Sequence, residues 1–349
     1  MDDKSLADLT ETMTGFSAAC VTKMSDLLGF DRKDVIAALS MMHSNFSNAY
    51  LPFAMFPFIN RHLCESSWRY RVEKVFHAND AVALHNEDER FLCRDELFPE
   101  VTGIVDGVPV YCHGPRDYYS GKNHQKSVSF QVGVTLDGKP LFKLPPVRGS
   151  QHDSKSFRVD PFLSGHRSCE LLLADKAYMN NAHCLAPYKI RSNSSETIDS
   201  QKKLFFNRVH SHRRARVERF FAYLDRHKFM HYCRHKKEWI ASAFHLMWNA
   251  EVLKSQSNTV TLRYPNTVTD ADSVPILSNL NLQHPCTCDF STKAACIDGR
   301  RDALRDKFWS MRDRIEKEIE PKAPGHTRRE AIVPEELARY RPKKRERVE

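Results

Sequence analysis

The feature that most constrains the fold is an apolar, β-branched run with one acidic residue inside it. Residues 101–112 read VTGIVDGVPVYC, and Asp106 is the only charged residue among them. β-Branched residues favour strands, and in a strand Asp106 would share a face with Ile104 and Val108. A carboxylate on a buried face costs free energy unless a cation or hydrogen-bond donors compensate for it. The sequence therefore predicts a strand through Asp106 and a compensating partner beside it.

A tight turn is the alternative for this motif. Asp106 precedes Gly107, and an Asp-Gly pair favours a turn in which the aspartate has an ordinary structural role. The motif alone leaves both interpretations open.

Three more strands are predicted after this run. KSVSFQVGVTLD (126–137) and KPLFKLPPV (139–147) are joined by a Leu-Asp-Gly-Lys turn of the hairpin type. A helix over SKSFRVDPFL (154–163) then leads to CELLLADKAY (169–178), which has the apolar centre of a buried parallel strand. This order predicts the α/β class: an RNase H-like domain whose mixed sheet has three antiparallel strands, then a parallel strand, and is flanked by helices.

The chain divides into three segments by composition. Residues 1–100 have the pattern of a helical N-terminal subdomain, which is either a packing unit or a DNA-reading helix-turn-helix. Residues 101–255 form the predicted RNase H-like α/β domain. Residues 256–349 are a loop-rich, charged C-terminal extension with a basic tail, and within it His284, Cys286, Cys288 and Cys296 either hold zinc or are ordinary thiols and an ordinary histidine.

Positive charge is concentrated in one segment. The whole chain has a formal net charge of +9, and residues 201–240 alone hold twelve Lys and Arg against three acidic residues. In the same segment, Val217, Phe220, Phe221 and Leu224 follow the spacing of one apolar helix face. A basic segment of this density favours a nucleic-acid partner, and a solvated helix face is the alternative.

Three acidic residues from separate elements could meet. If the first and fourth strands are neighbours, Asp106 and Asp175 lie side by side, and Glu218 lies on the basic helix that follows. Crowded carboxylates repel one another unless a cation lies between them, and carboxylate oxygens are the ligands that Mg²⁺ and Mn²⁺ prefer. The alternatives are a capping role for Asp175 and an exposed ion pair for Glu218.

Five runs in register resemble one family, the DDE nuclease domain of PIF/Harbinger transposases and Harbinger transposase-derived nucleases, over about residues 100–255. The runs are VDGVPV, YYSGKNHQKSVSFQVGV, RGSQHDSKSF, LLADKAYMNNAHCLAPYK and FFNRVHSHRRARVERFFAYLDRHKF. The resemblance implies a metal-dependent DNA endonuclease or transposase that hydrolyses phosphodiester bonds, with strand transfer as a further step. It also implies that Asp106, Asp175 and Glu218 are the catalytic DDE triad and hold two divalent ions, Mg²⁺ or Mn²⁺. Asp153 is a further metal ligand by resemblance, with a helix N-cap as its alternative.

The resemblance and the charge pattern together predict the partners. DNA is expected to contact basic residues of two segments, namely Lys122, Lys126, Arg213, Arg214, Arg216 and Arg219. The family resemblance implies a separate Myb-like DNA-binding partner and a homo-oligomer assembled on DNA. The polar N-terminus and the basic run at residues 341–347 predict an intracellular, nuclear protein with no membrane association. The competing hypothesis is a catalytically inactive DNA-binding or adaptor protein derived from a transposase.

Overall fold

The computed structural model describes most of the chain outside its last thirty residues. The described residues are 3–44, 65–80, 93, 95–152, 157, 171–179, 181, 183–190, 197–231, 233, 237–257 and 290–319. Several predictions lie outside these residues: the crossover helix at 154–163 apart from Phe157, the role of Asp153, the zinc cluster apart from the backbone of Cys296, and the basic tail. The chain divides into two compact units, Met1–Ser310 and Met311–Glu349.

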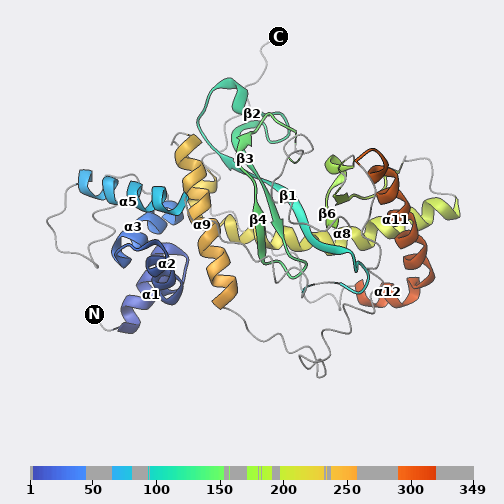
Figure 1. The fold of residues 1–349 in the computed structure, drawn as a ribbon, viewed down its shortest axis with the longest axis horizontal. Helices are drawn as coiled ribbons and strands as arrows, with labels where there is room; N and C mark the ends of the chain where they lie inside the picture. Colours follow the sequence, from blue (N-terminus) through green and yellow to red (C-terminus); the bar gives the residue numbers. More distant parts are fainter. Residues whose placement is uncertain are drawn as a thin grey trace, which may run out of the picture. The chain divides into compact units, whose positions relative to one another are not determined.

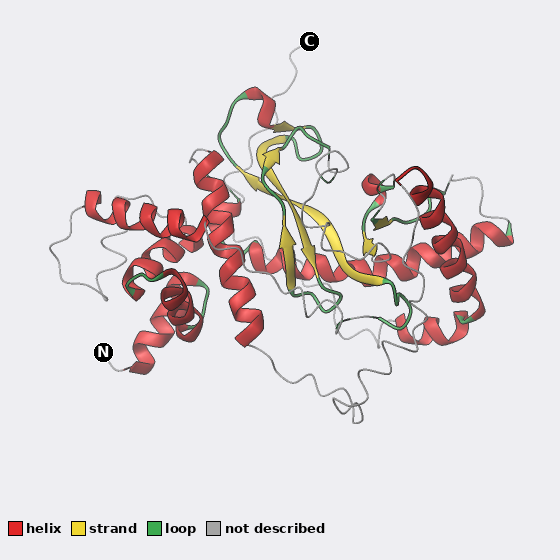
Figure 2. Ribbon diagram, viewed as in Figure 1, coloured by secondary structure: helices red, strands yellow, loops and turns green. Residues whose placement is uncertain are grey.

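A seven-stranded mixed sheet forms the centre of the first unit (Figures 1 and 2). Its strands are β1 (Val101–Tyr111), β2 (Tyr119–Ser120), β3 (Gln125–Val134), β4 (Pro140–Lys143), β5 (Val147–Arg148), β6 (Leu171–Leu173) and β7 (Cys184–Leu185). Their order is β2-β3-β1-β6-β7, and β4 and β5 also pair with β3. β1 is antiparallel to β3 and parallel to β6. The predicted mixed α/β sheet is therefore confirmed, whereas the RNase H-like assignment stays a prediction.

Asp106 lies inside β1 and not in a turn. Asp106 and Gly107 are the register partners of Val132 and Gln131 in β3, so the turn alternative is wrong. The predicted hairpin turn is formed further on, where the amide of Gly138 donates to the carbonyl of Thr135 and Gly138 has φ +89°, a conformation that favours glycine.

Helices cover the sheet and form the N-terminal part of this unit. They are α1 (Asp3–Thr14), α2 (Ala18–Leu28), α3 (Arg32–Ser44), α5 (Glu65–Asp80), α8 (Ile198–Leu224), α9 (Lys237–Ser257) and α11 (Phe290–Ser310), with 3-10 turns η2 (Arg116–Tyr118), η4 (Lys176–Tyr178) and η5 (Lys228–Met230). The second unit contains α12 (Arg312–Ile319). No helix within the described ranges is long and apolar enough to cross a membrane. That the N-terminal helices form a separate subdomain stays a prediction.

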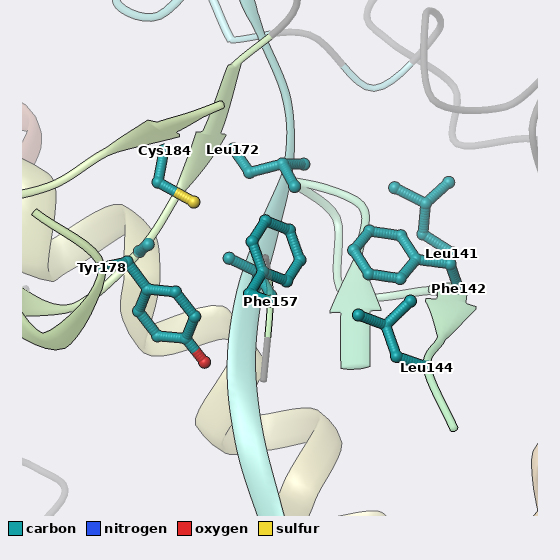
Figure 3. Close-up of a cluster of buried hydrophobic side chains, with 9 residues drawn as sticks. Leu141, Phe142, Leu144, Phe157, Leu172, Tyr178 and Cys184 are labelled. Carbon is teal, nitrogen blue, oxygen red and sulfur yellow. The ribbon is translucent and has the colours of Figure 1, made fainter. Parts of the chain in front are cut away.

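The two faces of the sheet have different coverings. One face carries a buried cluster that includes Val105, Phe142, Phe157, Leu172 and Tyr178 (Figure 3). Because side chains alternate along a strand, Asp106 points to the opposite face.

The opposite face packs against α8 and α9. Val132 of β3 is the register partner of Asp106, and Phe130 lies two residues before Val132, so Phe130 is on the same face of the sheet as Asp106. The ring of Phe130 stacks on Phe244 of α9 with centroids 3.9 Å apart. Phe220 of α8 in turn meets Trp248 of α9 edge to face. Asp106 therefore lies on the face that α8 and α9 cover, and its side chain is partly buried.

Candidate active site

The sheet register brings the first two predicted acids together. Ile104 of β1 and Leu173 of β6 are partners in the parallel pair, and Asp106 and Asp175 each follow two residues later. β6 ends at Leu173 and Asp175 is the N-cap of η4, so continuing the alternation of this parallel pair by two residues puts Asp106 and Asp175 on the face that packs against α8. The condition on which the sequence predicted their adjacency, that the two strands are neighbours, is met by β1 and β6.

Each aspartate already accepts one local backbone hydrogen bond. Oδ1 of Asp106 accepts from the amide of Gly107 at 2.8 Å. Oδ1 of Asp175 accepts from the amide of Ala177 at 2.7 Å and so caps η4. The capping role that was the alternative for Asp175 is thus present, and it uses Oδ1. These bonds fix the orientation of both carboxylates relative to their own strands.

The third acid reaches the site from α8, through an arginine. Nη1 of Arg214 lies 2.7 Å from Oδ2 of Asp106, and Nη2 of Arg214 lies 3.4 Å from Oε1 of Glu218. The side chains of Arg214 and Asp106 are 22% and 17% exposed, whereas that of Glu218 is 65% exposed. The guanidinium is therefore the cation that compensates Asp106 in this structure.

The donor set fits a divalent cation in part. Asp106 and Asp175 have the residue type and the common face that Mg²⁺ or Mn²⁺ requires. Glu218 is joined to Asp106 through Arg214, and within the described part of the chain no group of three His, Cys, Asp or Glu residues is arranged to hold a metal ion. That Asp106, Asp175 and Glu218 hold a divalent cation therefore stays a prediction.

A buried histidine lies beside this group. Nε2 of His210 donates to the carbonyl of Leu185 in β7 at 2.9 Å, which identifies Nε2 as the protonated nitrogen. Burial lowers the pKa of His210 to about 4, so the ring is neutral at physiological pH. Sequence reasoning did not select His210. The signal that could have found it is spacing, because His210, Arg214 and Glu218 recur every four residues on one helix face.

The other predicted DNA-binding arginines do not share one surface. Arg213 points inward, where its Nε lies 2.8 Å from Oδ2 of Asp95 and both side chains are nearly buried. Arg216 donates from Nη1 to the carbonyl of Leu136 and so ties α8 to the β3–β4 turn. Arg219 is exposed and makes no ion pair within the described residues.

The two predicted lysines lie at the β2–β3 hairpin. Lys122 and Lys126 are both exposed, and Nζ of Lys126 donates to the carbonyl of Gly114 at 2.6 Å. Of the six predicted DNA contacts, Lys122, Lys126 and Arg219 therefore have side chains that are open to solvent.

Buried contacts hold the turn that carries Asp175. Tyr178 of η4 is fully buried, and its hydroxyl donates to Oε1 of Gln131 in β3. Gln131 is the register partner of Gly107, the residue after Asp106. The hydrogen bond from Tyr178 thus links the segment after the second acid to the strand that pairs with the first.

This geometry lies within a segment that matches one family. Residues 105–247 match the family model of the DDE superfamily endonuclease. The matched DDE endonuclease segment contains Asp106, Asp175 and Glu218 and extends from β1 into α9. The match shows that this part of the chain is similar to a nuclease or transposase type of domain, whereas the Harbinger subtype and the catalytic roles of the three acids stay predictions. Comparisons with curated proteins and with solved structures gave no match.

Proposed function

We propose that this chain is a divalent-metal-dependent DNA endonuclease of the Harbinger type, either a transposase or a nuclease derived from one. The observation that carries the proposal is the common face of Asp106 and Asp175, two residues beyond register partners, inside the segment that matches the DDE endonuclease family. The approach of Glu218 from α8 adds a third carboxylate from a separate element.

The proposed roles follow from the side chains. Asp106 and Asp175 would hold the cation, and Glu218 would complete its ligands. A bound divalent cation supplies Lewis-acid stabilisation of the charge that develops on the phosphodiester oxygens. Hydrolysis breaks the bond between phosphorus and the 3′ oxygen and frees a 3′ hydroxyl, which is the nucleophile of a subsequent strand transfer. His210, neutral and bonded to Leu185, would keep α8 fixed against β7 during these steps.

DNA would approach through exposed cations. Lys122 and Lys126 at the β2–β3 hairpin and Arg219 on α8 are the basic residues proposed to contact phosphates. Such contacts carry no sequence information and weaken as salt concentration rises. The proposal extends to a nuclear location, a Myb-like DNA-binding partner and a homo-oligomer on DNA, which the family resemblance supports.

The ion pair between Arg214 and Asp106 supports a second candidate function, that of a catalytically inactive protein. Nη1 of Arg214 lies 2.7 Å from Oδ2 of Asp106 and compensates the charge of that carboxylate. If that ion pair is permanent, the chain is a catalytically inactive DNA-binding or adaptor protein that keeps the nuclease fold.

The test of the leading proposal is nicking of supercoiled plasmid DNA by the full chain with MgCl₂ or MnCl₂. The proposal predicts metal-dependent conversion to open circles, with loss of this activity to background in Asp106→Asn and Asp175→Asn. Asp26→Asn, which removes an exposed carboxylate of α2, is the matched control and should cut normally. Nicking that persists unchanged in both site variants would exclude these aspartates, and DNA binding without nicking would favour the inactive adaptor.

A further inference from the structure

Arg214 lies between two of the three acids that are proposed to hold a divalent cation. Its two terminal nitrogens contact Asp106 of β1 and Glu218 of α8, so one guanidinium joins two of the three proposed ligands. A guanidinium presents its donors in a fixed fork that matches carboxylate oxygens. Oδ2 of Asp106 binds this guanidinium less favourably once it also coordinates a divalent cation, because the two positive charges repel each other at that distance.

We propose that Arg214 is a resting counter-ion that a divalent cation must displace from Asp106 when it enters the site. The inference rests on the proposed function, since it concerns how the same carboxylates acquire their metal. In the metal-free protein Arg214 relieves the repulsion between neighbouring carboxylates. Metal binding then requires the arginine to swing away, and the measured affinity for the metal is lower by the free energy of the ion pair that is lost.

Arg213, the residue before Arg214, forms a more deeply buried ion pair with Asp95. Arg213 and Asp95 are 7% and 11% exposed, so separating them would leave two charges buried. Arg214 and Asp106 are 22% and 17% exposed, and Glu218, the second partner of Arg214, is 65% exposed. The guanidinium of Arg214 is thus less buried than that of Arg213, and an entering cation would compensate the partly buried carboxylate of Asp106 that the guanidinium leaves.

The test measures metal binding, independently of DNA cleavage. MgCl₂ and MnCl₂ are titrated into the full-length wild type, Arg214→Gln and Arg219→Gln, and the heat of binding and the rise in melting temperature are recorded. Arg219→Gln is the matched control, because it removes the same charge from α8 at an exposed position without an ion pair among the described residues. Both proteins lose one positive charge, so a difference between them reports the ion pair itself.

The expected result is an affinity about tenfold or more higher in Arg214→Gln, which corresponds to the loss of one charge-assisted hydrogen-bonded pair. Arg219→Gln should stay within about twofold to threefold of the wild type, which is the size of a screened surface effect. Arg214→Lys keeps the positive charge of the wild type. Its affinity for the metal should lie between those of the wild type and Arg214→Gln, because a single ammonium cannot bridge two carboxylates as the guanidinium fork does.

A second measurement follows the side chain of Arg214 by NMR in the wild type and uses no variant that has lost a charge. In the ¹⁵N-arginine-labelled wild type, MgCl₂ should shift the side-chain Nε resonance of Arg214, assigned by its absence from Arg214→Lys, and leave that of Arg213 in place. Equal metal affinity in the wild type, Arg214→Gln and Arg219→Gln would overturn the role of Arg214 while leaving the metal site intact. Loss of binding in Arg214→Gln would overturn it too, because Arg214 would then organise the ligands. Absence of metal binding in every protein would contradict the metal site and with it the proposed function.

Discussion

Nη1 of Arg214 and Oδ2 of Asp106 lie 2.7 Å apart, although 108 residues separate them in the sequence. Repulsion between neighbouring carboxylates alone would make Asp106→Asn more stable than the wild type. The ion pair reverses this expectation, because Asp106→Asn leaves the partly buried guanidinium without its closest partner. We expect the free energy of unfolding of the metal-free protein to fall by about 1 to 3 kcal/mol, the usual size for a lost hydrogen bond to a charged group. Urea denaturation measures it, and an increase in stability would contradict the structural role of the pair.

Tyr178→Phe should destabilise the fold through one hydrogen bond. The substitution removes the hydroxyl that donates to Gln131 and leaves the buried ring in place. We expect the urea midpoint to fall by an amount that corresponds to about 1 to 2 kcal/mol. Tyr119→Phe is the control, because the Tyr119 side chain is largely exposed and its hydroxyl can be lost at little cost. Equal midpoints for the two variants would show that the Tyr178 hydrogen bond contributes nothing to stability.

Gly133→Ala should destabilise the protein through a steric clash. A Cβ at Gly133 would lie 2.1 Å from Cε1 of Phe142, whose ring is fully buried in the cluster of Figure 3. Forcing a buried ring to move costs about 1 to 3 kcal/mol. Gly121→Ala has open space around its Cβ and serves as the control. Thermal unfolding compares them, and a melting temperature for Gly133→Ala that equals that of Gly121→Ala would be inconsistent with this packing.

Acid should weaken the fold through His227. This ring is buried, stacks on Phe16 with centroids 5.3 Å apart and meets His43 edge to face. Burial lowers its pKa from 6.5 to about 3, and the charges of His43, Lys254 and Arg226 act in the same direction. Below pH 6.5 the unfolded chain therefore binds a proton that the folded chain excludes until the pH approaches 3. The free energy of unfolding should fall across this window by up to about 1.4 kcal/mol per pH unit for this residue.

The control for this pH dependence keeps the packing. His227→Phe retains a ring against Phe16 and removes the titratable group, so the loss of stability between pH 6.5 and pH 4 should be smaller than in the wild type. His77→Gln, at an exposed position of α5, should leave the slope unchanged. If His77→Gln reduced the pH dependence of the free energy of unfolding as much as His227→Phe does, His227 would be excluded as the source of that dependence.

The strands β1, β3, β4 and β6 could be predicted from the sequence because their signals are local. The two-residue strands β2 and β7 were not predicted, and the pairing of β1 with β6 was only a condition. β-Branched alternation through Asp106 and the Asp-Gly hairpin turn each depend on residues that are close in the chain. The apolar stripe of α8 was predicted for the same reason, and Val217, Phe220 and Leu224 are buried as its spacing requires. The early start of α8 at Ile198 was not predicted, because the polar residues before Arg213 hide the helical period.

The partners of the arginines could not be predicted, because they depend on tertiary geometry. Arg213, Arg214 and Arg219 are equivalent as sequence signals, and all were predicted to contact DNA. In the fold, Arg213 meets Asp95 and Arg214 meets Asp106, each more than a hundred residues away. The position of α8 relative to β1 and to the segment before β1 decides which arginines form internal ion pairs. The basic segment therefore predicted a charged environment for Glu218 but not which residue would compensate Asp106.

The most direct test of the central claim is a crystal of the full chain grown with MnCl₂, with anomalous differences collected at a wavelength where manganese scatters strongly. The account predicts an anomalous peak within coordination distance of both Asp106 and Asp175, with the guanidinium of Arg214 moved off Oδ2 of Asp106. A well-ordered site with no peak between the two aspartates, and with Arg214 still 2.7 Å from Asp106, would contradict a metal-dependent nuclease centred on these residues.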